Sequence, residues 1–221
     1  HAVRIISMDN SGNLACAVYG YMNRGEHEGE VGVGIYYFDV ERNLIQEKAF
    51  IPSKKSYAIA ADELGKMVYY NHAEEQLYVL ADGTLYQVDL KKNKQTTLAE
   101  NLKEGQYAVS DDGHLMAYES EGNKKGGTEI QVMNLSSLHT YIVEAAEGEQ
   151  ISPLGFVNGD FIYGKMKSED AGKKASGESI TPMYELEIRN SKNKKVASYS
   201  FVDKGIYISD ILIDDNMVTL N

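Results

Sequence analysis

The sequence has 221 residues and combines an acidic charge balance with an ordinary globular composition. Its 33 Asp and Glu residues outnumber 22 Lys and Arg residues, which gives a formal net charge of -11. Because binding to nucleic-acid phosphates requires a cationic surface, this balance argues against a nucleic-acid partner. No run approaches the roughly 18 apolar residues that a membrane helix needs, so the sequence predicts no membrane span in this chain, and an anchor outside it stays possible.

The two ends of the chain resemble the interior of a longer protein. His1 enters a strand-like run with no basic and apolar leader, so no targeting signal is visible. Asp214–Asn216 followed by Met217–Leu220 is typical of a hairpin that has just begun. We therefore expect a piece of a longer protein whose targeting signals lie outside this chain.

A short β-prone motif, which ends in apolar residues and an Asp or Asn, recurs along the chain. Its copies are Ile35–Val40, Leu85–Leu90, Ile130–Leu135 and, in degenerate form, Leu186–Asn190. Their starts lie 45 to 56 residues apart, and a polar turn and another β-prone run follow each copy. Such a period indicates a repeated structural unit.

A second motif, an Asp/Asn–Gly turn that leads into an apolar strand, precedes each copy of the first. Its copies are Asp9–Asn13, Asp62–Lys66, Asp111–His114 and Asn158–Asp160, with Asp214–Asn216 as a fifth that has no downstream partner. Asp and Asn bond their own backbone and Gly adopts positive φ, so these segments predict hairpin turns. The same chemistry favours a turn over a calcium loop at Asp9–Asn13, which lacks the twelve-residue ligand spacing.

Each repeat is expected to form four strands. In the third repeat they are Gln106–Ser110, Leu115–Ser120, Glu129–Leu135 and Thr140–Glu144. The second repeat is ambiguous, because Met67–Asn71, Gln76–Leu80, Thr84–Leu90 and Gln95–Leu98 already supply four strands before Tyr57–Ala61 is counted. Either this repeat carries an extra short strand, or the last of its strands pairs differently.

Four-stranded antiparallel units at this period predict an all-β fold, namely a β-propeller. The expected blades are residues 3–52, 56–102, 105–145, 149–203 and an incomplete fifth at 205–221. An open ring leaves strand edges exposed, so we expect a single but partial propeller, a fragment of a larger one. An unusual closure between Val3–Met8 and the last hairpin is the alternative.

The third repeat, residues 105–145, carries a family resemblance. Ser110–Ser120 followed by Gly127–Leu135 resembles the blade of TolB-type and WD40-like propellers, with Asp111 where that family often has proline and Gln131 where it often has tyrosine. The N-terminal propellers of prolyl-oligopeptidase-like enzymes are similar. The resemblance implies a propeller scaffold, and this scaffold hosts many unrelated functions.

The loops between the second and third strands of the blades are the longest, at residues 21–31, 121–128 and 165–181. They are expected on one face, so they are candidates for contact with a partner, with mobile solvated insertions as the alternative. The candidate residues are Glu26, His27, Glu28, Glu30, Lys124, Lys125, Lys165 and Lys167. Adjacent residues on a glycine-rich loop rarely converge, so no metal site is predicted at Glu26–Glu30.

No catalytic residue and no cofactor site is predicted. The sequence has no G-x-S-x-G motif, and Cys16 lies in an apolar run that favours a buried, unreactive thiol. The first hypothesis is a non-catalytic binding domain of a larger, extracytoplasmic bacterial protein that recognises a protein or a surface glycan. The alternatives are the propeller of a serine hydrolase whose catalytic domain lies outside this chain, and a sensor module of a signalling protein.

Overall fold

A computed structural model describes residues 2–53, 68–120, 127–170, 172–173, 179–202, 208, 211–214 and 217–220. Contacts divide the chain into two compact units, His1–Glu100 and Asn101–Asn221, called unit 1 and unit 2 below. A short 3-10 helix, η1 (Ser168–Asp170), follows β14 in the second half of the chain. Among the described residues, no helix has the length and apolarity that crossing a membrane requires.

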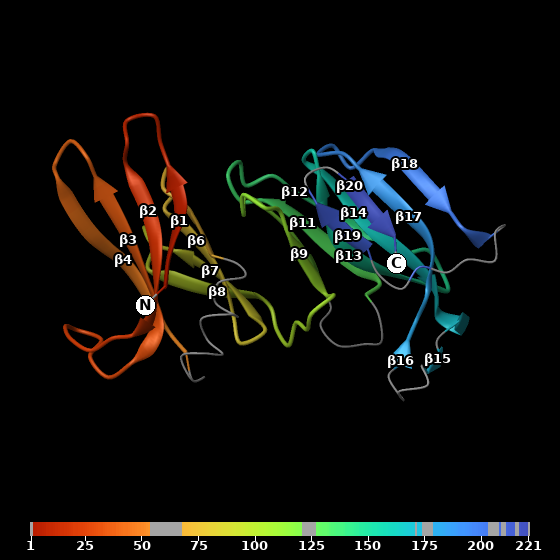
Figure 1. The fold of residues 1–221 in the computed structure, drawn as a ribbon, viewed down its shortest axis with the longest axis horizontal. Coiled ribbons are helices and arrows are strands. Elements are labelled where there is room, and N and C mark those ends of the chain that lie inside the picture. Colours follow the sequence, from red (N-terminus) through yellow and green to blue (C-terminus); the bar gives the residue numbers. More distant parts are fainter. Residues whose placement is uncertain are drawn as a thin grey trace. The chain divides into compact units, whose positions relative to one another are not determined.

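Unit 1 contains two four-stranded antiparallel sheets in which each strand pairs with the next in sequence (Figure 1). The first sheet consists of β1 (Ala2–Met8), β2 (Leu14–Tyr21), β3 (Val31–Asp39) and β4 (Leu44–Pro52). The second consists of β5 (Val68–Asn71), β6 (Gln76–Ala81), β7 (Thr84–Asp89) and β8 (Lys94–Ala99).

Unit 2 repeats this arrangement. Its first sheet consists of β9 (Tyr107–Val109), β10 (Leu115–Glu119), β11 (Glu129–Asn134) and β12 (Thr140–Glu144). Its second consists of β13 (Glu149–Val157), β14 (Asp160–Lys167), β17 (Met183–Arg189) and β18 (Lys195–Ser200). Two strand pairs complete the unit: β15 (Gly172–Lys173) with β16 (Ser179–Ile180), and β19 (Ile211–Asp214) with β20 (Met217–Leu220).

The predicted fold class is confirmed, because the chain is built from four-stranded antiparallel sheets of the kind found in β-propeller blades. In the second sheet β8 pairs with β7 in the ordinary way, so the alternative in which its last strand pairs differently is wrong. Tyr57–Ala61 lies outside the described residues. The assignment of all 221 residues to a single partial propeller stays a prediction.

Each unit buries an apolar core between its sheets. In unit 1 this core joins the facing sides of both sheets, with Ala17, Ile35, Val68, Tyr70 and Leu77 among its members. Unit 2 has one core around Ile130, Val143, Phe161 and Tyr163, and a second around Met166, Met183, Leu186 and Ile208. Tyrosines contribute to this packing as the sequence suggests, although Tyr199 is 56% exposed and packs in neither core.

The repeated Asp or Asn at the end of each third strand forms the same turn in all four sheets. The side-chain oxygen of Asp39, Asp89, Asn134 or Asn190 accepts a hydrogen bond from a backbone N–H two to four residues later. The donor is a backbone N–H in the turn, which has no partner in the strand ladder. The bond satisfies this N–H and stabilises the chain reversal. The Asp or Asn that ends each copy of the first motif thus has a local role in hydrogen bonding.

Each of these turns also places one residue at positive φ. Asn occupies that place at Asn43, Asn93 and Asn193, whereas the turn after β11 has Leu138 at φ 61°. Asn tolerates this left-handed conformation and Leu does not, because the Leu side chain crowds the backbone. Leu138 is therefore a strained position in an otherwise regular series of turns.

We expect Leu138→Asn to raise the free energy of unfolding by about 0.5–1 kcal/mol, since it relieves this strain and removes a side chain that is already partly exposed. The measurement is urea denaturation of the 221-residue chain followed by circular dichroism. Asn93→Leu is the matched control and should destabilise by a similar amount. A loss of stability in Leu138→Asn would show that apolar packing of Leu138 outweighs the strain.

Candidate functional site

A pocket of about 560 Å³ opens within unit 2, between the sheet β9–β12 and the sheet β13–β14–β17–β18. Its apolar wall is formed by Leu115, Val132, Met133 and Phe156. Polar residues make up the rest of the lining, namely His114, Asn134, Ser137, His139, Tyr141, Asn158, Asp160, Ser191 and Lys192 together with the backbone of Gly159. An apolar wall with convergent polar groups is the usual composition of a binding site.

Four tight turns frame the pocket, since consecutive hairpins of both sheets reverse at the same end. Between β9 and β10, Asp112 accepts hydrogen bonds from the Ser110 hydroxyl at 2.6 Å and from the backbone N–H of His114 at 3.3 Å. Between β13 and β14, Asn158 and Gly159 both adopt positive φ, which is the geometry of a two-residue hairpin. The other two turns, after β11 and β17, have the Asn134 and Asn190 side-chain bonds described above.

Two side-chain hydrogen bonds connect the two sheets, and one of them joins His139 and Ser191, which line the pocket. Asn193 donates from Nδ2 to the carbonyl oxygen of Ile142 at 3.0 Å, and Nε2 of His139 lies 3.0 Å from the carbonyl oxygen of Ser191. Because a carbonyl oxygen only accepts, Nε2 of His139 carries the proton in this contact. These bonds tie the turn after β17 to the neighbouring sheet and so set the width of the pocket.

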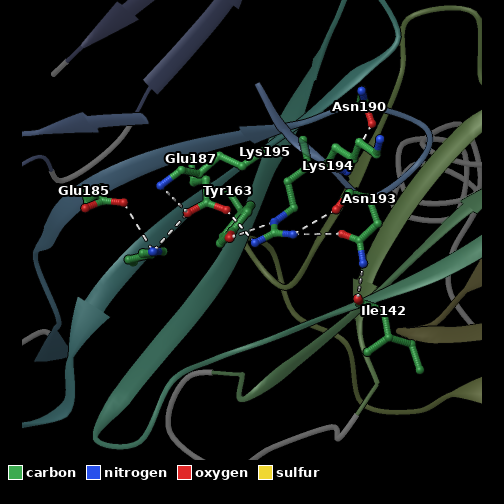
Figure 2. A network of polar contacts seen from close by, with 10 residues as sticks. Ile142, Tyr163, Glu185, Glu187, Asn190, Asn193, Lys194 and Lys195 are labelled. Atoms are coloured by element: carbon green, nitrogen blue, oxygen red, sulfur yellow. Dashed lines mark hydrogen bonds and ion pairs between the residues drawn. The ribbon is translucent and has the colours of Figure 1, made fainter. Parts of the chain in front are cut away.

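A charged network lies on the sheet next to the pocket, with Glu187 at its centre (Figure 2). Glu187 is only 2% exposed, and its carboxylate lies 3.0 Å from Lys165 Nζ and 2.7 Å from Arg189 Nη2. Lys195 Nζ is more distant at 3.9 Å, and Glu185 takes a second contact from Lys165 at 3.2 Å. A buried carboxylate is tolerated only when cations compensate it, and here three surround it.

The network affects the proton affinities of its members. Burial alone would raise the pKa of Glu187, but hydrogen bonds from Tyr163 and Lys165 and the charges of Lys165 and Arg189 bring it below the ordinary 4.5. Burial would lower the pKa of Lys165, yet hydrogen bonds to Glu187 and Glu185 raise it. Each partner thus stabilises the charged form of the other.

Arg189 connects this network to the pocket. Its Nε donates to the Tyr163 hydroxyl at 3.2 Å, while Nη1 donates to the backbone oxygen of Asn193 at 3.0 Å and to its side-chain oxygen at 3.1 Å. Asn193 in turn holds the neighbouring sheet through Ile142 (Figure 2). The charged network therefore positions the turn that carries Ser191 and Lys192, which line the pocket.

Two tyrosines at this site stay protonated at physiological pH. Burial raises the pKa of Tyr141, which lines the pocket, to about 12, and the nearby Asp160 carboxylate acts in the same direction. Burial also raises the pKa of Tyr163 to about 12. Both phenols therefore serve as neutral hydrogen-bonding groups.

The structure brings only some of the candidate loop residues into contact with other side chains. His27 packs flat on Phe50, with ring centroids 3.9 Å apart, and its Nε2 lies 2.9 Å from Glu47 and its Nδ1 3.6 Å from Glu30. Glu26 and Glu28 are exposed and take no part in this contact. Lys124 and Lys125 lie outside the described residues.

Lys165 was expected in a loop, and this placement is wrong. β14 continues through the buried Met166 to Lys167, so Lys165 lies within a strand and is paired with Glu185 and Glu187. Lys167 ends the same strand, with its ammonium 5.7 Å from the ring centroid of Tyr184. Cys16 is only part-buried, and burial raises the pKa of its thiol.

The sequence did not predict the pocket residues, because the longest loops, which are the usual signal of a binding face, lie at the other end of the blades. One indication was available: the two turn motifs of a repeat are separated by two strands, which places them at one end of the sheet. Which side chains meet across the pocket depends on two neighbouring sheets, and no single repeat contains that information. Over the described parts of the chain, no group of three or more His, Cys, Asp and Glu side chains is arranged to hold a metal ion.

The sequence matches no protein-family profile and no curated protein. Among solved structures it is similar to the β-propeller domain of the Trilobed protease from Pyrococcus furiosus, with 9% identity and a TM-score of 0.40 over 87% of this chain and 56% of that one. The tricorn protease has 12% identity and a TM-score of 0.37, over 80% of this chain and 17% of that one. Dipeptidyl peptidase 4 of Porphyromonas gingivalis has 9% identity and a TM-score of 0.29, over 89% of this chain and 39% of that one.

This chain thus spans little more than half of the first of these proteins and less of the other two. The similarities are too low to inform on activity, and the fold follows from the strand pairing described above.

We expect Glu187→Gln to destabilise unit 2 by about 1–3 kcal/mol at pH 7, because the part-buried Lys165 and Arg189 lose the carboxylate that compensates their charges. The pKa of Glu187 is lowered in the folded state, so its stabilisation is complete above the ordinary 4.5 and is lost as the pH falls below that value. The difference between wild type and variant should therefore shrink from pH 5 toward pH 3.

Urea denaturation at a series of pH values measures this difference. Glu185→Gln is the matched control, since Glu185 is more exposed and contacts Lys165 alone among the cations of the network. It should cost less than Glu187→Gln at every pH. Equal costs for the two variants would contradict a central role for Glu187.

Proposed function

We propose that this chain is a non-catalytic β-propeller binding domain of a larger, extracytoplasmic protein, and that the unit 2 pocket receives a segment of a protein partner. The observation that carries the proposal is the pocket itself, which four hydrogen-bonded turns and two bonds between sheets hold open. A site held by such turns needs little reordering when a ligand enters, and this lowers the entropic cost of binding.

The composition of the pocket favours a peptide segment. Its wall of Leu115, Val132, Met133 and Phe156 suits an apolar side chain, and its rim offers amide, hydroxyl and imidazole groups to a peptide backbone. Lys192 and Asp160 add one charge of each sign at the rim, which suits a partner with matching charges.

A β-propeller does not specify its own function, so the same blades would serve a serine hydrolase or a sensor protein. For the hydrolase, a G-x-S-x-G segment with later Asp and His residues should follow this chain in the full-length protein. Both alternatives stay predictions.

The proposal is tested with a random peptide library displayed on phage and selected on the immobilised 221-residue chain. Affinities of the selected peptides are then measured by fluorescence anisotropy against wild type and Lys192→Trp. The indole at position 192 should crowd the pocket and weaken binding at least tenfold, while the backbone N–H of residue 192 still bonds Asn190.

Lys92→Trp is the matched control, because Lys92 has the same backbone bond to Asp89 in the turn after β7 of unit 1. It should leave peptide affinity unchanged. Selected peptides that bind both variants as tightly as wild type, or a library that yields no binder, would contradict the proposed site.

A further inference from the structure

A second pocket, of about 550 Å³, lies in unit 1. Like the unit 2 pocket, it lies at the end of the sheets where the first and third hairpin turns are found. More than half of its lining is polar, and the two carboxylates of Asp39 and Glu41 balance the two cations of Arg42 and Lys48. The rest of its polar surface comes from Asn13, Gln46, the Ser11 hydroxyl, Tyr37 and the His72 ring. A pocket with a balanced charge, a mainly polar surface and some apolar surface from Val40 and the Tyr37 ring suits an uncharged, strongly hydrogen-bonding ligand.

His72 is held in this pocket by the ring of Tyr37 and by the hydroxyl of Tyr70. Its imidazole stacks on Tyr37 with centroids 4.0 Å apart and an interplanar angle of 12°. Its Nδ1 lies 3.2 Å from the Tyr70 hydroxyl oxygen. The stacking contact and the hydrogen bond together fix the orientation of the ring.

The proton positions follow from the partners. Tyr70 donates its single hydroxyl proton to the Glu75 carboxylate at 3.0 Å, and a charged acceptor makes this the stronger bond. The Tyr70 oxygen must then accept from His72, so Nδ1 of His72 carries the proton. In the neutral ring Nε2 is therefore left as an unprotonated acceptor.

Glu75 is itself held in an unusual conformation. Its φ of 53° lies in the left-handed region. Gly and Asn adopt this region readily, whereas Glu adopts it at a cost in conformational energy. Its carboxylate is fixed by Tyr70 and by Lys48 Nζ at 3.6 Å, and its carbonyl accepts from the Leu90 N–H at 2.9 Å. Burial and the Glu75 charge raise the pKa of Tyr70, which keeps its proton available to the carboxylate.

We propose that the unit 1 pocket is a saccharide-binding site, in which Nε2 of His72 accepts a hydrogen bond from a ligand hydroxyl. Neutral sugars offer many O–H donors and oxygen acceptors, which match the carboxylates, the cations and the amide of this lining. An anionic or cationic ligand would meet a like charge in Asp39 and Glu41 or in Arg42 and Lys48. The site belongs to a different unit from the peptide pocket, so either proposal can fail without the other.

The first test concerns the tautomer of His72. Long-range proton–nitrogen NMR correlations of the 221-residue chain above neutral pH should show a proton on Nδ1 and none on Nε2. In Tyr70→Phe, which keeps the buried ring and removes the acceptor, the balance should shift toward the Nε2–H form. A wild-type ring protonated on Nε2 would overturn the proposal.

The second test uses D-glucose, D-galactose, D-mannose and N-acetyl-D-glucosamine as probes, titrated while the imidazole signals are followed. At least one sugar should shift the His72 signals in a saturable way and leave those of His139 in unit 2 unchanged. Tyr70→Phe should weaken that affinity by about fivefold to tenfold, because the acceptor is no longer fixed at Nε2.

Gln46→Trp, which places a large ring at an exposed position of the lining, should abolish the shift while circular dichroism stays that of wild type. No response to any of the four sugars, an equal response of His72 and His139, or full affinity in Gln46→Trp would each overturn the saccharide site.

Discussion

The hydrogen bond from a backbone N–H to the Asp or Asn at the end of each third strand is the constraint on which this structure depends. It occurs at Asp39, Asp89, Asn134 and Asn190, once in every four-stranded sheet. The bond ends the third strand at a defined residue and therefore sets the register of the fourth. Two of these turns also border the unit 2 pocket, and one borders the pocket of unit 1.

The same frame thus supports two chemically different sites. In unit 2 the pocket has an apolar wall, and the charged network around Glu187 lies behind it in the sheet. In unit 1 the polar groups enter the pocket itself, and a relay from Glu75 through Tyr70 orients the imidazole of His72. The backbone turns supply a fixed geometry, and the side chains placed on them decide which ligand fits.

In both units a carboxylate is held by cations or hydroxyl groups from neighbouring strands. Glu187 keeps its charge because Lys165 and Arg189 approach it within 3.0 Å. Glu75 is only half-buried and contacts Lys48 and Tyr70. Because Tyr70 also contacts His72, the Glu75 charge influences the orientation of the His72 ring. In unit 2 the ionic contacts position the turn after β17, and in unit 1 they position the His72 ring. A ligand in either pocket would contact the turn or the ring in that position.

The sequence by itself determined the class of fold, the strands and their turns. Strand alternation and Asp/Asn–Gly turns act over a few residues, so β9–β12 appear almost as predicted from residues 106–144. Lys165 shows the limit of this approach, since nothing local distinguishes the polar end of a strand from the start of a loop.

Only the tertiary structure decided which side chains meet. His139 and Ser191 lie 52 positions apart in the sequence, and His72 depends on Tyr37 from another sheet. Contacts of this kind arise when neighbouring sheets pack face to face, and packing depends on the shapes of both faces together. Local hydrogen bonding thus specifies the repeated blade, and the packing of one blade on the next creates the sites.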